Sequence, residues 1–162
     1  MELVSRITIW LALICYVIGE TGRLKGQRHQ SILHRGRWVW TLGFILYLIH
    51  VLTAFETHHN WSHNEAEIHT ALQTEQLIGQ AWGWGIYVNY FFTLVWFMET
   101  LCWWKFPLRY RLRSKGLDCT VRAFFLFMIV NGAVIFVTSP FRWLGVVIVF
   151  ALLMAGWRSK RE

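Results

Sequence analysis

Long apolar segments separated by short polar stretches dominate the hydrophobicity pattern of this 162-residue chain. Several approach the roughly 20 residues that a helix needs to cross a bilayer. The chain has only two prolines, and its apolar runs are continuous, which favours helices over a membrane barrel. The pattern predicts an all-α polytopic membrane protein with about five transmembrane helices, at residues 3–19, 38–55, 86–104, 123–137 and 141–156.

The last two predicted spans are short and are separated only by a Thr138-Ser139-Pro140 turn. A four-span model with a re-entrant hairpin therefore remains the alternative. Neither internal repeats nor a separate soluble domain can be recognised, so we expect residues 1–162 to form a single helical bundle.

Composition supports the membrane class, since 56% of the residues are hydrophobic and 17% aromatic. The formal net charge of +7 would also suit nucleic acid. However, the cations gather at the ends of apolar runs, as topology signals do. The expected partners are therefore the lipid bilayer and further membrane subunits, and nucleic acid is not expected.

The distribution of cations predicts an orientation. The connections after the first and third spans, together with the C-terminal tail, contain 14 of the 16 lysines and arginines. Cytoplasmic loops carry such an excess. The sequence therefore predicts a multi-pass cell-membrane protein with its N-terminus and residues 56–85 outside and its C-terminus in the cytoplasm.

Tryptophans fall near the predicted membrane interfaces, where amphipathic rings are common. Eight of the 11 are placed there, so the high Trp content requires no cofactor stacking. The predicted inner set is Trp38, Trp40, Trp103, Trp104 and Trp157, and the outer set is Trp82, Trp84 and Trp143.

The predicted outer loop, residues 56–85, has four of the seven histidines and no lysine or arginine. Imidazole and carboxylate groups are ligands for zinc and copper, and no cysteine lies in this segment. A transition metal (Zn or Cu) or haem is therefore the expected cofactor. Within the loop, Ser62 and Glu65 fit a capping box, which predicts a short outer-face helix from His63 to Leu77 or Ile78.

Helical spacing divides the candidate ligands into two groups. His63 and Glu67 share one face of the predicted helix, whereas Glu65 and His69 share a nearly opposite face. The candidate metal ligands are His58, His59, His63, Glu67 and Glu56. His50, Asn89, His69 and Glu65 are candidate additional ligands or hydrogen-bonding neighbours of that site. The alternatives are a solvated polar loop and a pH-sensing role.

Polar residues inside the predicted spans form a second set of candidates. His50 shares a face with Gly43 and Tyr47, so it should point into the bundle and meet Asn89. Either the pair extends the outer site or it makes an interhelical hydrogen bond. Glu99 either extends toward the basic inner interface or serves in proton relay or cation binding. Asn131 is expected to bond across helices.

Three classes of function are compatible with this pattern. The first is a protein that handles a transition metal or haem at the outer membrane face. The second is an accessory or assembly subunit of a larger membrane complex, without chemistry of its own. A membrane enzyme is the least favoured, because no Ser-His-Asp, nucleotide-binding or Cys-His pattern occurs in a suitable context.

Overall fold

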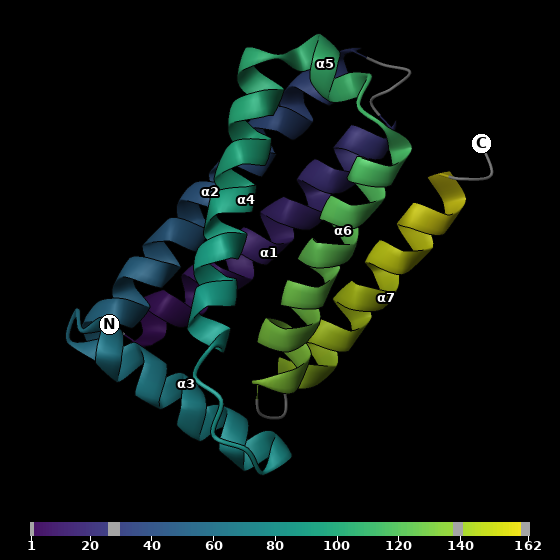
Figure 1. Cartoon of the computed structure of the whole chain (residues 1–162). Helices are drawn as coiled ribbons and strands as arrows, with labels where there is room; N and C mark the ends of the chain where they lie inside the picture. The colour runs from purple at the N-terminus through teal and green to yellow at the C-terminus, as the bar shows by residue number, and fades with distance from the viewer. Residues whose placement is uncertain (1, 26–29, 138–140, 160–162) are drawn as a thin grey trace.

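The computed structural model consists of helices joined by short connections (Figure 1). It describes the backbone of residues 2–25, 30–137 and 141–159 and the side chains of residues 2–24, 34–137 and 141–154. No strand occurs in these residues. The helices are α1 (Glu2–Lys25), α2 (Gln30–His59), α3 (His63–Ile78), α4 (Gly85–Lys105), α5 (Pro107–Arg111), α6 (Lys115–Val130), the π-helix η1 (Asn131–Ile135) and α7 (Phe141–Ser159).

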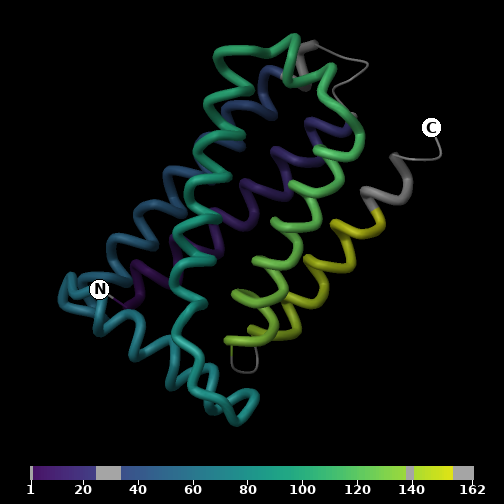
Figure 2. Tube along the Cα trace, in the orientation of Figure 1, coloured from purple at the N-terminus to yellow at the C-terminus, as the bar shows by residue number. Residues whose placement is uncertain are grey.

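The long helices run antiparallel, and α6 continues directly into η1 (Figures 1 and 2). The start of α1 and the whole of α3 lie at one end of the bundle. The end of α7 and the short helix α5 lie at the other end (Figure 1). The predicted segments at 3–19, 38–55, 86–104 and 141–156 lie within these long helices, and the segment at 123–137 covers most of α6 and all of η1 and extends two residues beyond it. Trp157 and the basic tail beyond it fall outside the described side chains.

α1 and α2 pack closely because a glycine faces their contact. A Cβ atom added to Gly43 would lie 3.0 Å from Cβ of Cys15 and 3.2 Å from the carbonyl oxygen of Ala12. A larger residue would push the two helices apart, so the close packing depends on glycine.

Aromatic rings form most of the core. Tyr16 stacks on Phe125 with the ring centroids 5.0 Å apart, and both rings contact Trp40 and Trp96. Trp103 stacks on Tyr110 at 5.4 Å. These rings join α1, α2, α4, α5 and α6 into one packed unit.

Trp40 and Trp103, which the sequence places at the inner interface, do not face outward. Their side chains are 2% and 1% exposed, so they belong to the core. The indole N–H of Trp40 donates to Thr100 Oγ1 at 3.1 Å, which satisfies its polar atom without a headgroup. Trp38, Trp82, Trp84 and Trp143 are exposed.

An ion-pair network joins the helices at the α5 end. It alternates three carboxylates with three guanidinium groups across α1, α4, α6 and the α5–α6 turn. Its balanced charge lets acidic groups remain buried beside cations. The members are Glu20, Arg23, Glu99, Arg113, Asp118 and Arg122.

Glu99 belongs to this network. Its carboxylate accepts hydrogen bonds from Arg113 Nη1 at 2.7 Å and from Tyr110 Oη at 2.8 Å. Burial, with the nearby Glu99 carboxylate, raises the pKa of the Tyr110 hydroxyl well above its usual range. The Tyr110 hydroxyl therefore keeps its proton and donates to Glu99. Glu99 itself extends toward the basic end of the bundle, which is one of the two alternatives that the sequence left open.

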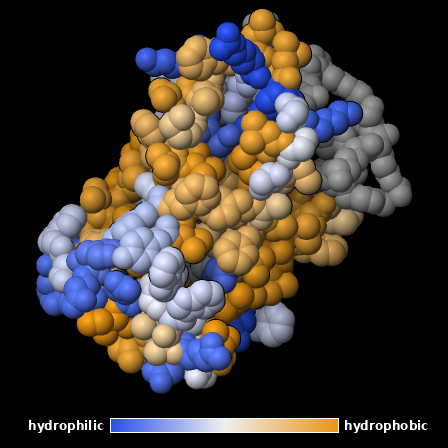
Figure 3. Space-filling view, viewed as in Figure 1, coloured by the Kyte–Doolittle hydropathy of each residue, from blue (hydrophilic) through white to orange (hydrophobic). Residues whose placement is uncertain are grey.

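Between its two ends the molecule exposes mainly apolar side chains. In Figure 3, hydrophilic residues gather near α3 and near α5, and the surface between them is mostly hydrophobic. Three helical stretches are long and apolar enough to cross a membrane: Glu2–Leu24, His34–His59 and Lys115–Ile135. So much exposed apolar surface indicates association with a membrane.

Candidate functional site

The histidine-rich segment 56–85 is mainly helical, and its first residues continue α2 beyond the predicted end at residue 55 instead of belonging to a loop. Glu56, His58 and His59 lie at the end of α2, and α3 occupies most of the remainder. α3 begins at His63 and ends at Ile78, as the sequence predicts. Ser62 Oγ accepts from the Glu65 backbone N–H at 3.3 Å, which confirms the N-cap.

The turn between α2 and α3 has an unusual backbone. Asn60 and Trp61 have φ angles of 45° and 60°, in the left-handed region that residues with a Cβ rarely adopt. Asn60 Nδ2 donates to Glu65 Oε2 at 3.2 Å, which ties the turn to the first turn of α3. This turn sets which face of α3 approaches the end of α2.

One face of α3 directs His63 toward α4. The Nδ1 atom of His63 lies 2.9 Å from the Tyr90 hydroxyl, and Nε2 lies 3.2 Å from the Tyr87 hydroxyl. Glu67 lies on the same face, 3.9 Å from Nε2. The shared face of His63 and Glu67 is thus confirmed, but its neighbours are tyrosines of α4.

The opposite face of α3 directs His69 toward the end of α2. The His69 ring centroid lies 6.2 Å from that of His58 and 5.2 Å from that of His59. The His58 and His59 centroids are 6.2 Å apart. The structure therefore gathers His58, His59 and His69, whereas helical spacing alone grouped His58 or His59 with His63.

The side-chain positions do not form a complete metal centre. Within residues 2–24, 34–137 and 141–154, no group of three or more His, Cys, Asp or Glu side chains is arranged to hold an ion. Glu56 is exposed near the end of α2.

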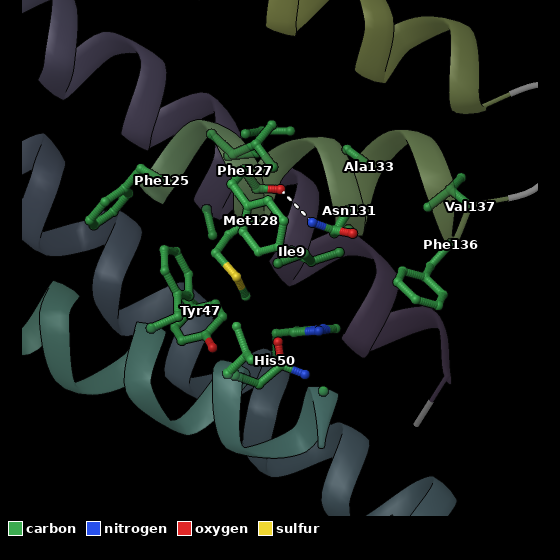
Figure 4. Close-up of a pocket in the computed structure, with 18 of the residues that line it drawn as sticks. Ile9, Tyr47, His50, Phe125, Phe127, Met128, Asn131, Ala133, Phe136 and Val137 are labelled. Atoms are coloured by element: carbon green, nitrogen blue, oxygen red, sulfur yellow. Dashed lines mark hydrogen bonds between the residues drawn. The ribbon is translucent and has the colours of Figure 1, made fainter. Parts of the chain in front are cut away.

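A larger feature lies inside the bundle. A partly open cavity of about 650 Å³ is lined by residues of α1, α2, α4, α6 and η1, together with α3 and the α3–α4 connection. Figure 4 shows Tyr47 and His50 on one wall, with Met128 and Asn131 across from them. Its walls are mostly apolar and aromatic, as in many small-molecule sites.

His50 is the histidine in the wall of this cavity. Its Nδ1 atom lies 2.9 Å from the Ser5 carbonyl oxygen and 3.0 Å from Ser5 Oγ. A carbonyl oxygen only accepts, so Nδ1 carries the hydrogen and Nε2 of the neutral ring retains its lone pair. No side chain or backbone group of the described residues bonds to Nε2, which leaves this lone pair for a ligand.

The predicted pair of His50 and Asn89 is found only in part. Both residues line the large cavity and a neighbouring one of about 150 Å³ that also reaches His59. The interhelical hydrogen bond of His50, however, goes to Ser5 of α1. Helical spacing placed His50 inside the bundle, but it gave no sign that Ser5 would be its partner.

Among the described residues Asn131 makes no hydrogen bond to another helix of the bundle, which corrects the expectation for this residue. Its Nδ2 donates to the Phe127 carbonyl oxygen at 2.8 Å, within its own helix. Asn131 is the first residue of η1 and lines the large cavity. π-Helical turns of this kind occur frequently at functional sites.

Comparisons with protein-family models, curated proteins and solved structures found no match to this chain.

Proposed function

We propose that this protein is a multi-pass membrane protein that binds a lipid-soluble ligand in the 650 Å³ cavity, with His50 as its polar anchor. The observation that carries the proposal is the free Nε2 lone pair of His50 in a largely apolar wall. The ligand class that fits is an apolar molecule with one hydroxyl group, because Nε2 accepts a hydrogen bond.

Five membrane crossings are part of the proposal. α4, α6–η1 and α7 run alongside α1 and α2 through most of the bundle, which supports full crossings over a re-entrant hairpin (Figure 1). α4 has 21 residues, enough for about 30 Å of hydrocarbon. The cation-rich connections lie at the α5 end, so α3 and the N-terminus lie outside the cell.

The architecture supports entry of the ligand from the membrane. A molecule dissolved in the bilayer already lies at the depth of the cavity, and apolar walls stabilise it by burial. Asn89 and Asn131 also line the cavity and provide amide groups for a second polar atom.

Haem is the alternative occupant, since the sequence suggested it. The residues present fit a haem, because the Nδ1–H of His50 is oriented by a backbone carbonyl, as in many metal-bound histidines. His50 would hold the haem iron through Nε2, and the Met128 thioether on the facing wall would be a further candidate ligand (Figure 4).

The test is purification in mild detergent, followed by solvent extraction with mass spectrometry and by an absorption spectrum. We expect a stoichiometric hydroxylated lipid and no Soret band. Gly132 lines the cavity, and a Cβ atom there meets nothing within 4 Å, so Gly132→Leu should narrow the cavity and lower lipid occupancy at least fivefold.

Gly116→Leu is the matched control, because Gly116 has equally open space at the start of α6 and does not line the cavity. His50→Phe should also lower occupancy while retaining an aromatic ring. A Soret band in the parent protein that is lost in His50→Phe would show that the bound molecule is haem and not a lipid. Absence of any bound molecule, or equal loss in the two glycine variants, would contradict the proposal.

A further inference from the structure

The cluster of His58, His59 and His69 is separate from the cavity and has its own geometry. The three ring centroids are 5.2–6.2 Å apart. Imidazoles bound to one tetrahedral zinc ion, with Zn–N distances of about 2.0–2.1 Å, place their ring centroids about 5 Å apart. The three rings therefore already have nearly the spacing that one ion requires.

A strained turn produces this arrangement. Two consecutive non-glycine residues, Asn60 and Trp61, adopt left-handed φ angles directly after His59. Such conformations are costly, and they concentrate at functional sites where the surrounding structure maintains them. Here the strained turn brings His69 back against the end of α2.

A buried nitrogen without a partner lies within the cluster. His59 Nδ1 is enclosed and has no hydrogen-bond partner among the described residues. Buried polar atoms are normally paired, so an unpaired one points to a missing ligand or a change in side-chain position. His58 and His69 are exposed, which leaves their rings free to rotate.

We propose that His58, His59 and His69 bind one divalent transition-metal ion of the zinc or copper type at the α2–α3 corner. The imidazole nitrogens do not converge in the present positions, so binding requires rotation of the rings about their side-chain bonds. Three imidazoles leave a fourth coordination position for water or an exogenous ligand. Glu65, bonded to Asn60 beside the cluster, adds favourable negative charge.

The full-length protein in detergent, stripped with a chelator and dialysed, is titrated with Zn²⁺ and separately with Co²⁺. We expect one equivalent of each metal and a tetrahedral cobalt spectrum. His69→Ala and His59→Ala should each weaken Zn²⁺ binding at least tenfold and alter the cobalt spectrum.

His63→Ala is the matched control, because His63 lies on the same helix but bonds to Tyr87 and Tyr90. It should leave Zn²⁺ affinity within twofold of the parent. The circular dichroism spectrum of each variant checks that the bundle is folded. A parent protein that binds no metal, or folded variants in which His63→Ala costs as much as His69→Ala, would overturn the proposal.

Discussion

Glu99 illustrates what a single residue contributes to this bundle. A carboxylate inside a predicted membrane span is costly when it stands alone. Here Arg113 donates to it and also donates to Asp118, so one guanidinium group serves two acidic side chains. Arg113 therefore has a structural role, although by sequence it resembles any other cation of the basic connections.

Replacing Arg113 with leucine should destabilise the bundle by about 3 kcal/mol, because Glu99 would remain buried without its partner. Thermal or denaturant unfolding in detergent measures the change. Arg111→Leu is the control, since Arg111 is exposed on α5 and should cost less than about 0.5 kcal/mol. If adding Glu99→Leu to Arg113→Leu restores no stability, the buried pair is not the cause.

At the scale of elements, local sequence signals set the ends of α3, and tertiary contacts set its position. The Ser62 cap starts the helix, and Gly79, with φ of 74°, ends it. Close contact then fixes where α3 lies. A Cβ atom on Gly83 would lie 2.7 Å from Glu67 Cγ, so the connection to α4 passes tightly beneath α3.

Ser62→Ala should weaken the start of α3 by about 1 kcal/mol, because the Glu65 backbone N–H loses its acceptor. Hydrogen exchange in residues 63–70 should accelerate, while exchange at the start of α6 should not change. Ser114→Ala removes an equivalent cap from α6 and should produce the reverse pattern. Unchanged exchange in both segments would mean that tertiary contacts alone fix these helix starts.

At the scale of the whole molecule, the two ends of the bundle differ in chemistry. The α3 end contains the histidine cluster, and the α5 end contains the ion-pair network. The mostly apolar surface between them matches the slab that a bilayer would cover (Figure 3).

Reporter fusions after Trp61 and after Glu162 should therefore report opposite sides of the membrane, since the proposed five crossings separate the two ends. A fusion after Gly116, in the basic connection before the last two helices, should agree with the fusion after Glu162. Identical readouts after Trp61 and Glu162 would require an even number of crossings between the two sites and would favour four spans over five.

The sequence by itself determined the helices and several of their limits. Apolar periodicity and capping residues act within a few positions of the chain, so the α3 boundaries and the inward face of His50 could be predicted. The opposite faces of His63 and His69 followed from helical geometry for the same reason.

Only the tertiary structure decided which residues meet. Spacing along α3 separates His63 from His69, but the backbone of Asn60 and Trp61 determines that His69 turns toward His58 and His59. The Ser5–His50 bond and the Arg113–Glu99 pair join different helices. Such contacts depend on how whole helices pack, which no local pattern specifies, and the large cavity likewise exists only once the bundle has formed.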